Sequence, residues 1–419
     1  MEKVFTFPLI LLLMATFCPV AAEESSPEGY AARAIQSVKE GKQEEALADF
    51  DKAIQLAPEK PINYRNRAAF YVLTKQWDKA IADDSKVLKL ESNDLSTQLN
   101  RGYAYLQIGQ LDQALADFGT VLKVQPDNER ALRFRSYIYA EKKEYAKAAA
   151  DLTQLIQKNP DDGLSYKARG DANLVLQKWI EAITDYSKAL QSIPGDLDSL
   201  SRRALAYLHI GDKEKELADL DTVIAAKPTD FDALKMRARV HSEREEIEQA
   251  IADYSKAIEL RASDDSLYSG RGFAELKKGD KAAAVEDFSK AIELKPDEGA
   301  YYTARSYVYV SQGDSVKAIE DFTRLMALKP DDEDLILRRA NLYLKLNKPN
   351  EALADYEKIL AKDPQNVIAL AGKGEAIAKQ GNRRAGAEEL QKALQRASDP
   401  KEKEEIQTKL REIGVGPLQ

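Results

Sequence analysis

The sequence contains few of the side chains that catalysis and metal binding most often use. Its 419 residues include one cysteine, Cys18, and two histidines, His209 and His241. The residues required for zinc ligation and for Cys-His or Ser-His catalysis are therefore nearly absent. No Gly-rich phosphate loop and no dinucleotide fingerprint occurs. We expect a protein that is not an enzyme and has no catalytic, cofactor-binding or metal site.

Strand signals and long hydrophobic runs are also scarce. The sequence has no sustained period-two alternation and no Asn-Gly hairpin turn. Its one long apolar run lies at the start, from Val4 to Phe17, and small residues follow it up to Ala22. This pattern is typical of a secretory signal peptide over residues 1–22, cleaved after Ala22 and followed by a short leader over 23–26. We expect a periplasmic or secreted protein without stable membrane insertion after cleavage. The alternative is a protein anchored in the membrane through the N-terminal segment.

The charge balance is acidic, with a formal net charge of -8. An excess of acid argues against nucleic acid or an anionic membrane surface as the main partner. Cleavage of the signal peptide would also remove Cys18, so the mature chain would contain no disulfide. The fold must then be held by its core alone.

Internal repetition dominates the rest of the chain. Prolines recur on a 34-residue grid, at Pro58, Pro126, Pro160, Pro194, Pro228, Pro296, Pro330 and Pro364. Such a period indicates an array of identical supersecondary units. The grid predicts eleven repeats, with the ranges 27–60, 61–94, 95–128, 129–162, 163–196, 197–230, 231–264, 265–298, 299–332, 333–366 and 367–400.

Each repeat is predicted to form two helices joined by a turn. A first apolar stripe ends at a glycine such as Gly279, which accepts the left-handed conformation that terminates a helix. A second stripe then continues to the grid proline. Small residues stand at one fixed place in each helix, as Gly272 and Ala284 do in the eighth repeat, and allow the two axes to approach closely. Large residues such as Phe288 follow the second small column and are predicted to fill the space between hairpins.

The 34-residue period, the small-residue columns, the aromatic column and the closing proline resemble tetratricopeptide repeats. The resemblance covers the whole chain after the signal segment. It implies an all-α protein, an α-solenoid in which antiparallel helical hairpins form a right-handed superhelix and the first helices line a concave groove. Residues 401–419 depart from the pattern, and the apolar stripe of Ile406, Leu410 and Ile413 predicts a capping helix followed by a tail.

Two charged columns flank the small residues. The first helices carry Arg33, Arg67, Arg101, Arg135, Arg169, Arg203, Arg237, Arg271, Arg305, Arg339 and finally Lys373. Sixteen residues later the second helices carry Asp49, Asp83, Asp117, Asp151, Asp185, Asp219, Asp253, Asp287, Asp321, Asp355 and finally Glu389. Because an arginine can satisfy a carboxylate bidentately, we expect a ladder of ion pairs beside the close helix contacts. An exposed basic stripe for an anionic polymer is the alternative.

Three repeats depart from the consensus and are expected to be weak. The second has Asp84 in the aromatic column, the sixth has Glu216 in the alanine column, and the seventh has Glu245 in place of the turn glycine. Each unit of a solenoid touches only its neighbours, so such units should loosen first.

The groove face of the first helices supplies the candidate binding residues. Aromatics fall there in two pairs, Tyr103 with Tyr137 and Phe273 with Tyr307. Exposed aromatics with flanking arginines are typical binding anchors. The predicted partner-binding residues are Arg65, Asn100, Tyr103, Arg130, Arg133, Tyr137, Arg239, Phe273, Tyr307 and Arg338. The alternative is that the rings pack against the neighbouring repeat.

The resemblance also bears on the ligand. Arg65, Asn100 and Arg130 coincide with three of the places that family members use to hold a peptide's terminal carboxylate, whereas Ala69 and Phe134 depart from that pattern. We expect an exported scaffold or adaptor that binds a protein or peptide partner, an acidic or carboxylate-bearing one, in the groove. The alternatives are an envelope or polysaccharide-export adaptor that contacts glycan, and a regulatory subunit of a separate enzyme.

Overall fold

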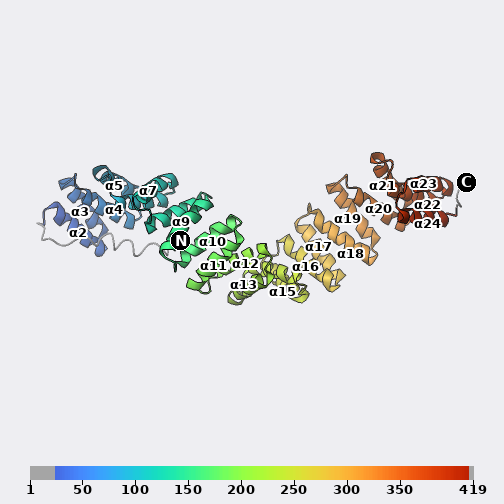
Figure 1. Ribbon diagram of the computed structural model, residues 1–419, viewed down its shortest axis with the longest axis horizontal. Helices are drawn as coiled ribbons and strands as arrows, with labels where there is room; N and C mark the ends of the chain where they lie inside the picture. The colour runs from blue at the N-terminus through green and yellow to red at the C-terminus, as the bar shows by residue number, and fades with distance from the viewer. Residues whose placement is uncertain (1–23, 415–419) are drawn as a thin grey trace. The chain divides into compact units, whose positions relative to one another are not determined.

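The computed structural model describes residues 24–414, which fold into helices without any strand. The predicted signal peptide lies outside these residues. Twenty-three helices follow one another along the chain (Figure 1). Their bounds are α2 Pro27–Lys39, α3 Gln43–Leu56, α4 Pro61–Leu73, α5 Trp77–Leu90, α6 Leu95–Gln107, α7 Leu111–Val124, α8 Glu129–Glu141, α9 Tyr145–Lys158, α10 Gly163–Val175, α11 Trp179–Ser192, α12 Leu197–Ile210, α13 Lys213–Ala226, α14 Phe231–Glu243, α15 Ile247–Leu260, α16 Asp265–Lys278, α17 Lys281–Leu294, α18 Gly299–Gln312, α19 Ser315–Leu328, α20 Glu333–Lys345, α21 Pro349–Lys362, α22 Val367–Lys379, α23 Arg383–Arg396 and α24 Pro400–Glu412.

Each predicted repeat contains one even-numbered and one odd-numbered helix, so the protein is an all-α solenoid of hairpins closed by α24. The first helices of neighbouring hairpins also approach each other directly, at α2/α4, α6/α8, α10/α12, α14/α16 and α20/α22. Within residues 24–414, no two second helices approach each other as closely as these pairs of first helices do. We call the face formed by the first helices the groove face, after the concave groove that the resemblance implies. No helix in the described part of the chain is long and apolar enough to cross a bilayer.

The chain divides into two compact units within α13. The first unit ends at Asp219 and the second begins at Leu220. The division falls in the same helix as Glu216, the buried acid that replaces an alanine of the repeat pattern.

The turns between the two helices of a hairpin all use the left-handed conformation. The predicted turn glycines have positive φ angles, for example 78° at Gly41 and 95° at Gly279. Asn347 follows with 55°. Where the pattern lacks glycine, the same place holds Lys75, Lys143, Gln177 and Glu245, with φ from 57° to 63°. A non-glycine residue there costs about 1–2 kcal/mol, so the surrounding packing determines the turn even where the local sequence opposes it.

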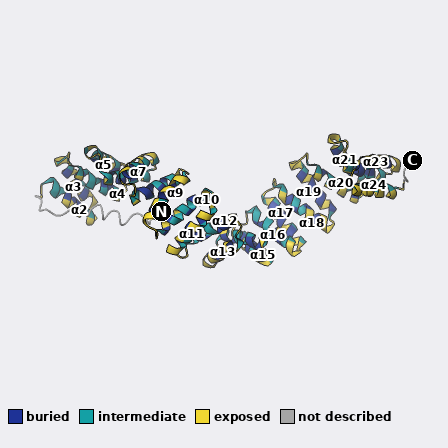
Figure 2. Ribbon diagram, in the orientation of Figure 1, coloured by how far each residue is buried: buried dark blue, intermediate teal, exposed yellow. Residues whose placement is uncertain are grey.

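The small residues mark places where no larger side chain fits. A Cβ added to Gly272 would lie 3.2 Å from the Cβ of Asp287 and 3.1 Å from the ring of Phe288. At Gly102 the ring of Phe118 would be only 2.8 Å away. Buried residues occur along every hairpin (Figure 2), so the core is a series of clusters shared between neighbouring hairpins. This is the packing that the columns predicted.

The predicted ladder of ion pairs is present in ten of the eleven hairpins. In each, Nε and Nη2 of the arginine donate to the two carboxylate oxygens of the aspartate at 2.6–3.0 Å. The exception is the last hairpin, where Lys373 pairs with Glu357 and Glu389 pairs with Lys392. A lysine has no planar fork, so the bidentate pair is not reproduced there.

Eight of these ten arginines also join neighbouring hairpins, which the sequence analysis did not predict. Their remaining nitrogen, Nη1, donates to a side chain on the second helix of the preceding hairpin at 2.5–3.1 Å. The acceptors are Asp51, Ser85, Thr153, Ser187, Asp221, Ser255, Ser289 and Thr323. One guanidinium therefore fixes both the packing within a hairpin and its contact with the hairpin before it.

Unlike the ladder aspartates, Asp84 is buried without a hydrogen-bond partner within residues 24–414. It is 1% exposed, and neither carboxylate oxygen has a hydrogen-bond partner among the described residues. Its neighbour Asp83 is paired with Arg67. Burial, followed by the negative charge of Asp83, raises the pKa of Asp84 well above its usual range. The second repeat thus stores an unpaired acid where other repeats place a large apolar side chain.

The final helix, α24, has the role expected of it. Asp399 caps its start by accepting a hydrogen bond from the backbone of Lys401. Ile406 is buried against Leu370 and Leu390, while the other faces are mostly exposed. This helix covers the apolar surface that the last hairpin would otherwise leave open.

We expect Asp287→Ala to lower the free energy of unfolding by about 3 kcal/mol. The substitution would strand the partly buried Arg271 guanidinium beside Gly272. The matched control is Glu286→Ala, which removes an exposed carboxylate from the same helix and should cost less than about 0.5 kcal/mol. Urea denaturation of both variants measures the difference, and equal values would mean that the ladder contributes little.

The pH dependence of stability tests Asp84. Above the ordinary aspartate pKa of about 3.9, the unfolded chain loses this proton while the folded chain retains it. Stability should therefore fall by about 1.4 kcal/mol per pH unit until the raised folded pKa is reached. The Asp84→Leu variant introduces the residue that the fourth repeat has at the equivalent position, Leu152. This variant should be more stable, and its free energy of unfolding should lack this dependence on pH. Trp77 fluorescence in urea, in a Trp179→Phe background, reports the second repeat, and parallel pH curves would contradict the assignment.

Candidate functional site

The two predicted aromatic pairs differ in how far they are exposed. Tyr103 is partly buried, with its ring centroid 5.9 Å from that of Trp77 and 5.2 Å from that of Phe134. Tyr137 is packed against the same cluster. These two rings are therefore engaged in packing between repeats, which was the alternative reading of the pattern.

The second aromatic pair projects into solvent. Phe273 is 50% exposed and Tyr307 is 46% exposed, although the edge of Phe273 also contacts Phe288 at 5.0 Å. Both lie on the groove face, on the consecutive first helices α16 and α18. The Arg338 guanidinium sits 5.4 Å from the Tyr307 ring centroid.

Most of the predicted groove arginines are already bound to acids of the same chain. Arg65 donates to Asp94 at 2.5 Å and to Glu91 at 2.8 Å. Arg133 pairs with Asp162 at 2.8 Å, and Arg338 pairs with Asp334 at 2.6 Å. Arg239 lies 3.7 Å from Glu243. Asp94, Asp162 and Asp334 stand at helix starts, whereas Glu243 ends α14. The pairs tie neighbouring first helices together or brace one helix.

Arg130 is different. Its Nε and Nη2 atoms are buried and have no hydrogen-bond acceptor among the described residues. Burial lowers the pKa of this guanidinium, with the Tyr103 hydroxyl as the neighbour that opposes the effect. Arginine nevertheless stays protonated, so the charge persists. Asn100, predicted to act with it, is only 8% exposed.

A network of opposite charges fills the groove face farther along the first unit. Asp171 accepts a hydrogen bond from the Tyr186 hydroxyl at 2.8 Å and lies 3.4 Å from Arg202. Asp198 contacts both Arg202, at 3.0 Å, and Lys167, at 2.9 Å. Burial raises the pKa of Asp171 despite the nearby Arg202. Because these charged side chains already pair with one another, few of them are available to bind a partner protein.

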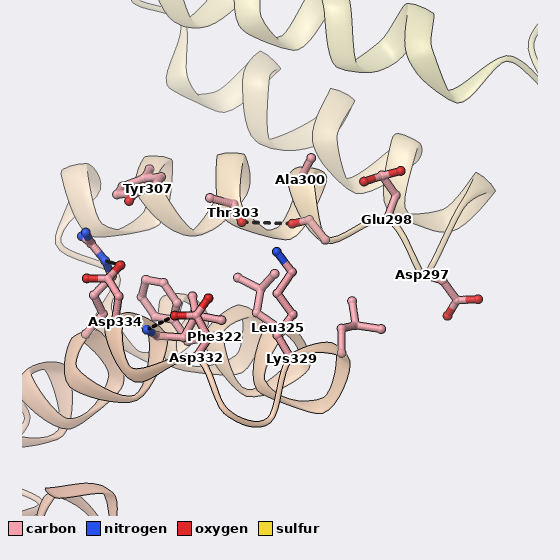
Figure 3. A pocket seen from close by; sticks show the side chains of 14 residues that line it. Asp297, Glu298, Ala300, Thr303, Tyr307, Phe322, Leu325, Lys329, Asp332 and Asp334 are labelled. Atoms are coloured by element: carbon pink, nitrogen blue, oxygen red, sulfur yellow. Dashed lines mark hydrogen bonds and ion pairs between the residues drawn. The ribbon is translucent and has the colours of Figure 1, made fainter. Parts of the chain in front are cut away.

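A pocket of about 600 Å³ opens beside Tyr307 in the second unit. Figure 3 shows Tyr307, Thr303 and Ala300 on one side and Phe322, Leu325 and Asp332 on the other. Its walls come from α18, the end of α19 and the start of α20. The sequence analysis named Tyr307 and Arg338 but missed the rest, because the wall residues belong to different columns of the repeat.

Both histidines have partners within the chain, and Nε2 of His241 lies 3.8 Å from Asp253. His241 is buried, and its Nδ1 is 2.6 Å from Glu246. His209 is exposed and stacks on Trp179 with ring centroids 3.9 Å apart. Within residues 24–414, no group of histidine, cysteine and acidic side chains is arranged to hold a metal ion.

Comparison with known families gives one consistent result. The model of the tetratricopeptide repeat matches residues 99–163, 144–196, 270–333 and 337–402, which together exceed half of the chain. A further model, described as TPR repeat, matches residues 238–279. No curated protein matches the chain.

The chain is also similar to solved structures of several proteins. The C-terminal part of a TPR repeat-containing protein from Cytophaga hutchinsonii has a TM-score of 0.50 and 19% identity, covering 57% of this chain and 98% of its own. Yeast Tom70 has a TM-score of 0.36 and 17% identity, covering 92% and 95%. YrrB, described as a TPR protein with an unusual peptide-binding site, has a TM-score of 0.39 and 23% identity, covering 45% and 97%. At these identities the similarity concerns the fold alone.

The difference between the two aromatic pairs predicts a difference in stability. Tyr103→Ala should lower the free energy of unfolding by about 2 kcal/mol, because it removes two aromatic contacts from a partly buried site. Tyr307→Ala, the equivalent change at an exposed ring, should cost less than about 1 kcal/mol. Urea denaturation of the two variants decides the matter, and a larger loss for Tyr307→Ala would reverse the assignment.

Proposed function

Since the chain belongs to the tetratricopeptide repeat family, we propose that it is a scaffold that binds a protein or peptide partner on its groove face. The partner presents a carboxylate to Arg130 in the first unit. We further propose that the protein is exported, on the basis of the apolar run from Val4 to Phe17 and the small residues up to Ala22.

The observation that carries the carboxylate proposal is the unpaired state of Arg130. A buried cation without an acceptor is costly, and a bound anion would offset that cost. A carboxylate matches the planar guanidinium fork and is the anion that arginine binds most favourably in proteins. The other predicted groove arginines already pair with carboxylates of the chain, so they would gain less from the carboxylate of a ligand.

The position of Arg130 suits a ligand on the groove face. It is the second residue of α8, and α8 approaches α6 directly. Tyr103 of α6 lies beside it and presents a half-buried ring. A chain end or an acidic side chain placed there would gain a charge-assisted hydrogen bond.

The test compares paired peptide arrays that differ only in their C-terminus, which is a free carboxylate or a carboxamide. The full-length protein should prefer the carboxylate form. Arg130→Met should abolish the preference, with a loss of about 10–100-fold in affinity, because one charge-assisted hydrogen-bond pair is removed. The variant should be as stable as the parent or more so, since the unpaired charge is gone.

Arg133→Met is the matched control. It removes the next arginine along α8, whose charge Asp162 already neutralises. This variant should lose stability and keep the carboxylate preference. An equal preference in the parent and in Arg130→Met would reject the proposal.

A further inference from the structure

The pocket beside Tyr307 has a construction that the repeat pattern does not require. At the start of α18 stand Gly299 and Ala300, and a Cβ added to Gly299 would lie 3.3 Å from Leu325 and 3.8 Å from Leu328. The absence of a side chain there leaves the apolar floor uncovered. Leu328 is 40% exposed and Tyr307 is 46% exposed, so the floor remains open to solvent.

The rim of the pocket is acidic. Among its lining residues, Asp297, Glu298, Asp332 and Asp334 oppose two cations, Lys329 and Arg338. Their formal charges sum to a negative value because the carboxylates outnumber the cations two to one. An apolar floor under an acidic rim is complementary to a group that is apolar at its end and cationic beside it.

Two of the rim acids form no ion pair within the described part of the chain. Asp334 is bound to Arg338 at 2.6 Å, and Glu298 is bound to Lys295 at 3.0 Å. Neither Asp297 nor Asp332 forms an ion pair with any residue that the structure describes. Asp332 accepts the backbone N–H of Leu335 at 3.3 Å as the cap of α20, and that bond leaves its negative charge in place.

We propose that this pocket binds a basic amphipathic segment of a partner protein, with an apolar side chain on the floor and a lysine or arginine beside Asp297 and Asp332. The proposal is independent of the carboxylate site, because it concerns the other unit and the opposite charge. Figure 3 shows Ala300 and Thr303 on one side of the pocket and Leu325 and Asp332 on the other.

The test uses three capped pentapeptides that share the same two apolar residues: Lys-Leu-Lys-Phe-Lys, Glu-Leu-Glu-Phe-Glu and Ser-Leu-Ser-Phe-Ser. Each is titrated into the full-length protein while the methyl NMR signals of Leu325, Leu328 and Thr303 are followed. The cationic peptide should shift these signals at a concentration about tenfold lower than the neutral one. The anionic peptide should shift them least.

Two variants locate the effect. Asp297→Asn with Asp332→Asn neutralises the rim and keeps the helix cap, because asparagine already caps α8 and α22 in this chain. It should reduce the affinity for the cationic peptide about tenfold and leave the neutral peptide unchanged. Ala300→Phe should fill the entrance and weaken both peptides.

Ala282→Phe is the matched control, since Ala282 is the exposed second residue of α17. Melting of all variants by circular dichroism checks that they fold. The proposal holds if only the pocket variants lose binding. It is overturned if the three peptides shift the signals equally, if none shifts them at millimolar concentration, or if Ala282→Phe weakens binding as much as Ala300→Phe.

Discussion

The bidentate pair between an arginine of the first helix and an aspartate of the second is the interaction on which the rest of the structure depends. Small residues such as Gly272 bring two helices so close that even an added Cβ would lie only 3.1–3.2 Å from the facing side chains. A planar guanidinium beside the contact holds both carboxylate oxygens and still has one nitrogen free for the preceding hairpin. The aspartates are nearly fully buried, whereas each arginine retains some exposure, so the charge is both satisfied and hydrated.

This dependence explains why the array tolerates some departures and not others. Turn positions accept Lys75 or Glu245 in the left-handed conformation because the helices on both sides are already fixed. Asp84 replaces a large apolar side chain without gaining a partner, so its cost is not offset locally. The pairs on either side of it, Arg67 with Asp83 and Arg101 with Asp117, remain intact. The repeat keeps its geometry and holds a buried acid whose protonation stabilises it.

The candidate binding surfaces arise where the chain's own charges fail to cancel. Along most of the groove face, arginines and acids of neighbouring repeats neutralise each other, as at Arg133 and Asp162. Arg130 in the first unit has no such partner, and Asp297 and Asp332 in the second unit have none among the described residues. These are the two places where we propose that a partner binds. The two sites differ in sign, which would allow one scaffold to bind two kinds of partner.

The sequence alone determined the features that repeat. A period without insertions predicts the hairpins, the small-residue contacts and the ladder, because identical local environments recur in each unit. It also singled out Arg130, Tyr307 and Arg338. Only the tertiary structure decided which groove residues remain available, since that depends on contacts between columns and between repeats. Tyr103 is held by Trp77 and Phe134, and Arg65 by Asp94, while Arg130 is left unpaired. The pocket at Gly299 likewise depends on how three helices meet, and no single column of the sequence records that.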